Sequence, residues 1–298
     1  MSNMDASRML LERLIDTKGL AVRTNQHDDA FWYTSGRPGP YYINTQNIAG
    51  AHAAKHLLTQ ITNLLKETES RERQVIEIAA MINQTVQDDP SYLKSIDTLV
   101  DYYLSHSSTR PSIISGGERR DWFFSIPVAA RLGIPHIFLF KSGDLFVTDH
   151  EGKPLDLAIK DMEVLHVSDI INQASSYVNR WIPILSKAGV SLTETLTVAV
   201  RSQVGRDSLA RSHVHVVAPL SVDPSLFKQA LDLELIPTYA YNEIIQFYDS
   251  PREWTRRYLS EVNLEQSEVL DPVKRERLSF FKENDIYHLK EEFPRFFQ

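Results

Sequence analysis

The sequence contains no cysteine among its 298 residues, and this absence removes several chemistries at once. Without a thiol, the chain forms no disulfide and carries no thiolate nucleophile, cysteine zinc site or iron–sulfur cluster. Glycine (11 residues) and proline (14) are too scarce for a collagenous or low-complexity chain. The remaining composition, 42% hydrophobic and 24% charged, is that of an ordinary globular protein.

Long hydrophobic runs and an excess of positive charge are also missing. No run approaches the roughly 20 apolar residues of a membrane span, and the first residues show no apolar stretch of signal-peptide type. The net charge is −7, whereas proteins that coat nucleic acid are usually basic. We therefore expect a soluble cytoplasmic protein that binds neither membrane nor nucleic acid. A local phosphate site is still compatible with this charge, because a few N–H groups and one or two cations suffice.

The N-terminal part of the chain is predicted to be helical around an aromatic hairpin. Apolar residues at helical spacing predict helices over about 5–18 and 51–66, and a helical insert over about 68–109 that is interrupted at Asp89-Pro90. Between the first two helices, aromatic runs flank a Gly/Pro turn within residues 31–43, which is typical of a hairpin.

From residue 112 the pattern changes to strands that alternate with helices. Strand, glycine loop, helix and strand follow one another twice, and this order predicts βαβ units. The predicted strands are 112–114, 136–140, 163–167, 195–200 and 214–217, with a hairpin formed by 145–148 and 154–157. The fold class is therefore α/β, with a central, mostly parallel sheet flanked by helices. We expect one domain over 1–222 and a helical extension over 223–298 that packs on it.

Ligands of open parallel sheets bind beyond the carboxyl ends of the strands, and the first loop at that edge covers residues 115–121. Gly116 and Gly117 stand just before a predicted helix, where backbone amides approach an anion closely. Arg119 and Arg120 would add charge-assisted bonds to a phosphate. The alternative is a tight glycine turn with two arginines in solvent.

The second loop at the predicted edge covers residues 168–176. Asp169 directly follows a buried strand, where a carboxylate binds a sugar diol or a magnesium-bound water. Ser175 and Ser176 would hold a phosphate at the start of the next helix; the alternative is that Ser175 is only a helix cap. His213 and His215 have strand spacing and no acidic partner in a metal-binding motif, so no metal site is expected there.

The order of these segments resembles the type I phosphoribosyltransferases, and most closely the orotate phosphoribosyltransferases. The resemblance covers roughly 5–66 and 110–222. It rests on the hairpin Phe31…Ser35-Gly36…Tyr41-Tyr42-Ile43-Asn44, the loop Ser115–Gly117, the run Leu132-Gly133-Ile134-Pro135, the strand end Phe140-Lys141 and the segment Val167–Ser176. The last of these corresponds to the family's signature for phosphoribosyl diphosphate (PRPP).

The chain departs from the family pattern at the positions that carry charge. The first acidic residue of the PRPP signature is Ser168, and the Thr-Thr-Gly-Gly stretch is Asn172-Gln173-Ala174-Ser175. The family's mobile loop is basic, whereas residues 140–152 here have a net charge of −2 and keep only Lys141. Because the lost groups would neutralise the leaving pyrophosphate, either Arg119, Arg120 and Lys141 replace them or the reaction is lost.

The resemblance implies transfer of a 5-phosphoribosyl group from PRPP to orotate or a related base, in pyrimidine nucleotide metabolism. It implies Mg²⁺ as cofactor and a homodimer. Asp169 and Lys141 would be catalytic, with Asp169 reaching the metal through water. The implied substrate or phosphate ligands are Ser115, Gly116, Gly117, Arg119, Arg120, Asn172, Gln173, Ala174, Ser175, Ser176, Phe31 and Tyr42. The alternatives are a non-catalytic relative that binds a nucleotide or sugar phosphate, and a structural subunit.

Overall fold

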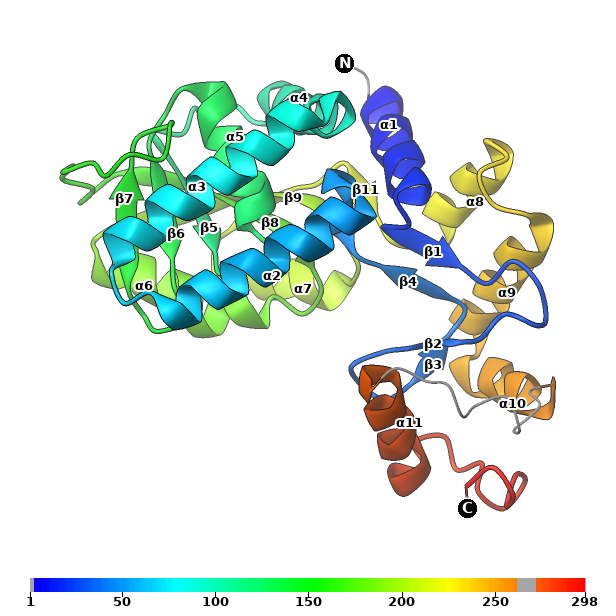
Figure 1. Ribbon diagram of the computed structural model, residues 1–298. Helices are drawn as coiled ribbons and strands as arrows, with labels where there is room; N and C mark the ends of the chain where they lie inside the picture. The colour runs from blue at the N-terminus through cyan, green and yellow to red at the C-terminus, as the bar shows by residue number, and fades with distance from the viewer. Residues whose placement is uncertain (1–2, 262–271, 298) are drawn as a thin grey trace. The chain divides into compact units, whose positions relative to one another are not determined.

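The computed structural model describes residues 3–261 and 272–297, which fall into two compact units (Figure 1). The first unit is the chain up to Gly19 together with Asn44–Asp223. The second is Leu20–Ile43 together with the chain from Pro224 onward. The expected division placed residues 20–43 in the first domain, whereas here they pack with the C-terminal helices.

Within residues 113–221, a seven-stranded sheet forms the centre of the first unit. Its order is β10-β9-β8-β5-β6-β7, with β11 paired to β9, and every pairing is parallel except β6 with β7. The strands are β5 (Ile113–Gly117), β6 (His136–Leu139), β7 (Leu145–Thr148), β8 (Glu163–Ile171), β9 (Ser191–Val200), β10 (His215–Val217) and β11 (Leu220–Ser221). This confirms the predicted α/β class with a mostly parallel sheet.

Helices flank this sheet, as the hydrophobic spacing predicts. They are α1 (Asn3–Asp16), the 3₁₀ helix η1 (Thr45–Ala49), α2 (Ala51–Glu67), α3 (Arg71–Asp88), α4 (Pro90–His106), α5 (Trp122–Leu132), the π-helical turn η2 (Tyr177–Trp181), α6 (Ile182–Lys187) and α7 (Gln203–Arg211). Helix α5 packs against β5 and β8, and the insert helices α3 and α4 pack against α5. The insert therefore forms an outer helical layer on one face.

The predicted break at Asp89-Pro90 is the start of α4. The Asp89 carboxylate accepts hydrogen bonds from the amides of Ser91 (2.9 Å) and Tyr92 (3.1 Å), and Pro90 occupies the first helical turn, where its missing N–H costs nothing. The Tyr92 hydroxyl donates to the carbonyl of Phe123 in α5. That carbonyl lies four residues before Pro127, which has no N–H to bond it, so α4 supplies the donor that α5 lacks.

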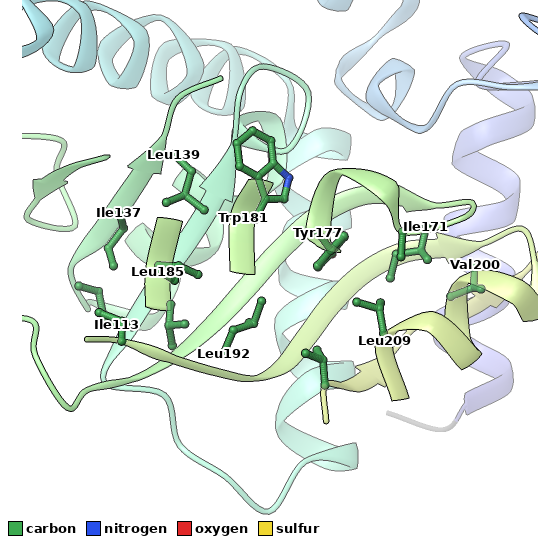
Figure 2. Close-up of a cluster of buried hydrophobic side chains, with 14 residues drawn as sticks. Ile113, Ile137, Leu139, Ile171, Tyr177, Trp181, Leu185, Leu192, Val200 and Leu209 are labelled. Atoms are coloured by element: carbon green, nitrogen blue, oxygen red, sulfur yellow. The ribbon is translucent and has the colours of Figure 1, made fainter. Parts of the chain in front are cut away.

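A buried hydrophobic cluster fills the space between the opposite face of the sheet and the chain that follows β8 (Figure 2). Aromatic rings of η2 and aliphatic side chains of four strands meet there. The labelled members are Ile113, Ile137, Leu139, Ile171, Tyr177, Trp181, Leu185, Leu192, Val200 and Leu209. This cluster packs the helical segment after β8 against the strands that carry the candidate site.

The predicted hairpin over residues 145–157 differs from the structure. Strand β7 pairs antiparallel with β6, and the segment after it meets β7 through a bridge between Thr148 and Pro154 and a hydrogen bond from the amide of Leu155 to the carbonyl of Val147 (3.1 Å). The chain therefore reverses twice, once at residues 140–144 and again at the predicted turn at Glu151-Gly152. Apolar side chains of β7 reach the buried cluster, which favours pairing with the central sheet.

The second unit combines two small antiparallel sheets with four helices of its described residues. Strand β1 (Leu20–Val22) pairs with β4 (Tyr41–Ile43), and β2 (Phe31–Trp32) pairs with β3 (Pro38–Gly39). The helices are α8 (Pro224–Asp232), α9 (Thr238–Asp249), α10 (Pro251–Glu261) and α11 (Pro272–Asn284). Aromatic side chains from the hairpin and the helices form one cluster, which explains why residues 20–43 belong to this unit.

Among the helices of residues 3–261 and 272–297, none is both long and apolar enough to cross a bilayer.

Candidate functional site

Four loops follow the carboxyl ends of neighbouring parallel strands in the first unit. They cover residues 118–121 after β5, 140–144 after β6, 172–174 after β8 and 201–202 after β9. Since these strands are adjacent and parallel, all four loops lie at one edge of the sheet. This is the edge at which the sequence predicts a ligand site.

The carboxylate of Asp121, in the first of these loops, binds the backbone at the carboxyl ends of β5 and β8. Its Oδ2 accepts a hydrogen bond from the amide of Gly117 (3.1 Å), and its Oδ1 accepts one from the amide of Asp169 (3.2 Å). Glu118 adds a second connection, because its Oε2 accepts from the amide of Lys141 at 3.0 Å. The expected neighbours Gly117 and Asp169 are thus brought together, through a residue that the sequence had not singled out.

The buried side chain of His166 lies next to the Asp121 carboxylate. His166 of β8 is fully buried, and its Nδ1 lies 2.9 Å from the Oγ of Ser115, a predicted ligand residue that is itself fully buried. The Nε2 of His166 lies 3.5 Å from Asp121 Oδ2 and has no hydrogen-bond partner within the described residues. Ser115 therefore belongs to the support of the site rather than to its surface.

Asp169 is half-buried beside Asp121. It lies within β8, which continues to Ile171, so the predicted loop over 168–176 is shorter in the structure and begins at Asn172. Burial and the neighbouring charge of Asp121 raise the pKa of the Asp169 carboxyl group to about 7. The hydrogen bond from the amide of Ile170 (2.6 Å) and the charge of Arg120 oppose this shift. Strongly perturbed carboxyl groups at the end of a sheet are typical of functional sites.

Gly116 and Gly117 lie in β5 and are needed for packing. A Cβ on Gly117 would lie 2.3 Å from Cε2 of Trp181 and 2.7 Å from Oδ2 of Asp121. A Cβ on Gly116 would lie 2.0 Å from Oγ of Ser125. Both glycines are buried, and because they lack a Cβ they leave room for the neighbouring side chains.

Replacing Gly117 with alanine is expected to lower the free energy of unfolding by about 2 kcal/mol, because Trp181 is buried and cannot retreat without disturbing its neighbours. Urea unfolding measures the change. The double variant Gly117→Ala/Trp181→Phe is the control: since the smaller ring of phenylalanine relieves the clash, its loss should be smaller than the sum of the two single losses. Additive losses would contradict this account.

The two arginines of the first loop occupy different environments. Arg119 is half-buried and its Nη1 donates to Oγ1 of Thr62 in α2, whereas Arg120 is exposed. The peptide bond between Glu118 and Arg119 is cis. Arg120 is therefore the arginine that faces solvent at the predicted ligand edge.

The segment after β8 keeps the shape of a loop that leads into a helix. Asn172 and Gln173 are exposed, and Ala174 adopts a left-handed conformation (φ 57°) before the helical segment begins at Ser175. Ser175 and Ser176 are exposed in its first turn, where amide groups have no partner one turn earlier in the helix. The carbonyl of Asn172 contacts Gly205 of α7, at which a Cβ would lie 2.0 Å away.

The expected mobile loop after β6 is a tight turn in the structure. The guanidinium of Arg71, from α3, lies 4.2 Å from the ring centroid of Phe140 and donates to Ser142 Oγ (2.9 Å) and Asp144 Oδ2 (3.1 Å). Lys141 is exposed in this turn, held by its backbone amide on Glu118. The insert helix α3 therefore holds the turn in place.

The remaining predicted residues, Phe31 and Tyr42, belong to the second unit. Their rings stack with centroids 6.3 Å apart. Asp121, Glu118, His166 and Tyr177 were missed by sequence reasoning. The one sequence signal for Asp121 is its place at the start of the helix that follows the glycine loop, a place that is also typical of an ordinary helix cap.

Comparison with known proteins bears on the fold of the chain. No protein-family model matches the sequence, and no curated protein matches it. Among solved structures, UMP synthase of Leishmania donovani is 12% identical with a TM-score of 0.53 over 80% of this chain. The chain spans only 41% of that protein. Orotate phosphoribosyltransferase of Francisella tularensis is 15% identical with a TM-score of 0.50, over 81% of this chain and 98% of that one. At such identities the likeness concerns the fold: the α/β sheet and its flanking helices match the type I phosphoribosyltransferase fold.

Proposed function

We propose that the first unit binds a 5-phosphorylated ribose at the carboxyl edge of β5 and β8, and that it transfers the phosphoribosyl group of PRPP to orotate or a related nucleobase. The observation that supports this most is the Asp121 carboxylate, which holds the amides of Gly117 and Asp169 together. It brings the glycine loop and the acidic loop to one place. These are the two loops between which a sugar phosphate would bind.

Each part of the ligand has a chemically suitable partner at this edge. The carboxylate of Asp169 would accept hydrogen bonds from the ribose hydroxyls, and the first amides of the helical segment at Ser175 and Ser176 would hold the 5′-phosphate. Arg120 and Lys141, both exposed, would meet the pyrophosphate. In the reaction, the C1–O bond to pyrophosphate breaks, a C1–N bond to the base forms, and the proton of the base N–H passes to solvent or to the departing pyrophosphate. A nearby carboxylate favours the positive charge that develops on the ribose.

Magnesium is a suitable partner for this chemistry, because it does not need a cage made only of protein groups. In the described part of the chain, no three His, Asp or Glu side chains come together in a way that would hold a metal ion. Mg²⁺ usually keeps several waters and binds through one or two carboxylates and substrate phosphates. Asp169 would supply that carboxylate contact. When bound, the ion would offset the charge of the leaving pyrophosphate.

A second function, binding without transfer, is favoured by the turn at residues 140–144. Catalysis would require positive charge and exclusion of water over the pyrophosphate. Here the turn is short, contains Asp144, and is held by Arg71. A protein of this kind would bind a nucleotide or sugar phosphate and pass the signal to a partner protein.

Pyrophosphate release from PRPP, measured with Mg²⁺ and a panel of pyrimidine and purine bases, separates the two functions. We expect base-dependent release, and we expect ribose 5-phosphate to raise the melting temperature. A ligand-induced shift without any release would support binding alone. Absence of both release and a thermal shift, with PRPP, ribose 5-phosphate and nucleoside monophosphates, would contradict both functions.

A further inference from the structure

The Asp121 side chain has more partners than a helix cap needs. No backbone amide within α5 is bonded to its carboxylate; both amide donors, Gly117 and Asp169, come from outside the helix. The side chain is only 13% exposed, so these bonds form largely out of water, where hydrogen bonds to a charged group are strongest. The Asp121 carboxylate therefore binds backbone outside α5 rather than capping the helix that follows it.

A second observation concerns the buried histidine next to Asp121. His166 is fully buried, and its Nε2, which lacks a hydrogen-bond partner within the described residues, lies 3.5 Å from Asp121 Oδ2. Leaving a buried polar atom without a hydrogen-bond partner costs free energy, so the position of Nε2 calls for a structural reason. Its other nitrogen is fixed by Ser115, which aims Nε2 at the Asp121 carboxylate. The histidine therefore presents a buried nitrogen to the Asp121 carboxylate.

The adjacent hydroxyl is not available to a ligand. Ser168 precedes Asp169 in β8 and is buried, and its Oγ accepts a hydrogen bond from the Tyr177 hydroxyl at 2.7 Å. The same hydroxyl of Tyr177 lies 2.8 Å from Oγ1 of Thr195. At this end of β8, Asp169 is thus the acidic group that reaches the surface, and Asp121 is the group that holds its backbone.

We propose that Asp121 is a positioning residue for the ribose subsite: it binds the backbone at the ends of β5 and β8 so that the Asp169 carboxylate meets two neighbouring hydroxyls of the sugar. This inference rests on the proposed function, because it assumes that the site accepts a phosphorylated ribose. It assigns Asp121 a role in choosing ribose over 2-deoxyribose. The phosphate contact at Ser175 and Ser176 does not depend on Asp121.

Binding of ribose 5-phosphate and 2-deoxyribose 5-phosphate to the full chain, measured by titration calorimetry, tests the proposal. Wild type is expected to prefer ribose 5-phosphate by about tenfold, the scale of one hydrogen bond to a charged group. The variant Asp121→Asn has one acceptor oxygen in place of two, so it can accept from the amide of Gly117 or from that of Asp169 but not from both. It should lose most of this preference while keeping its affinity for 2-deoxyribose 5-phosphate.

A matched control is Asp149→Asn. The Oδ1 of Asp149 also accepts from two amides, those of Glu151 and Lys153, both at 2.9 Å, but it lies in the turn after β7. This variant should bind both sugars as wild type does. Amide hydrogen exchange adds a readout without ligand: in Asp121→Asn, and in Asp121→Ala if the first variant folds poorly, exchange should rise at Gly117 or Asp169.

The outcomes separate the inference from the proposed function. Loss of sugar preference in Asp121→Asn together with faster exchange at the loop amides supports the positioning role. An unchanged preference for ribose 5-phosphate in that variant overturns it, even if the protein is less stable. If wild type binds neither sugar phosphate, the proposed function fails, and the exchange data still show whether Asp121 holds the two loops.

Discussion

Replacing Asp169 with asparagine is expected to lower kcat/KM for PRPP by about 10²–10³, the typical loss when one charged group that stabilises a transition state is removed. The variant keeps the size of the side chain and one acceptor oxygen, so the fold is preserved. What it removes is the negative charge at the end of β8, beside the ribose carbon at which charge would develop. Steady-state pyrophosphate release measures the effect.

The same variant is expected to be more stable than wild type at high pH. Burial and the charge of Asp121 raise the pKa of Asp169 from 3.8 to about 7, so the folded chain binds this proton more tightly than the unfolded chain does. Folding stability from this group is therefore full at low pH and declines as the pH rises from about 4 to about 7. The asparagine variant has no such decline, so its melting temperature should exceed that of wild type at pH 8.

Together these two effects distinguish a functional carboxylate from a structural one. A residue that lowers activity and also lowers stability when replaced is explained by damage to the fold. One that lowers activity while raising stability is held in an unfavourable setting because the site needs it there. If Asp169→Asn melts below wild type at pH 8 and releases pyrophosphate at the wild-type rate, Asp169 is structural.

Replacing Glu243 with alanine is expected to lower the free energy of unfolding by about 3–5 kcal/mol, the cost of leaving a buried charge without its partner. Glu243 is 5% exposed and Arg23 is 1% exposed, and the two form an ion pair. Glu243 also accepts from Trp254 Nε1 (3.0 Å) and from Arg257. The Arg23 guanidinium lies 4.9 Å from the ring centroid of Tyr258.

This contact joins residues far apart in the chain, because Arg23 follows β1 and Glu243 lies in α9. Loss of Glu243 should therefore detach residues 20–43 from the helices of the second unit, which urea unfolding followed by tryptophan fluorescence would detect. The exposed Glu292, paired with Arg252 and Arg256, provides the control. Glu292→Ala should change stability by no more than about 0.5 kcal/mol. Equal losses in the two variants would contradict a special role for the buried pair.

Much of the fold was predictable because it depends on local patterns. The break at Asp89-Pro90 follows from a capping carboxylate and a residue without an N–H, and the parallel strands follow from short apolar runs between glycine loops and helices. The edge of the sheet that carries the candidate site follows from the same order of elements. Asp169 was singled out because it stands directly after a buried strand.

The sequence alone determined the α/β class, the helical insert and the edge of the sheet at which Asp169 lies, since each depends on residues close together in the chain. Only the tertiary structure decided that Asp121 holds the two loops, that Trp181 fills the space over Gly117, and that Arg71 holds the turn after β6. It also assigned residues 20–43 to the second unit. The physical reason is distance along the chain: a hydrogen bond from Asp121 to Asp169, or an ion pair between Arg23 and Glu243, leaves no periodic or local pattern in the sequence.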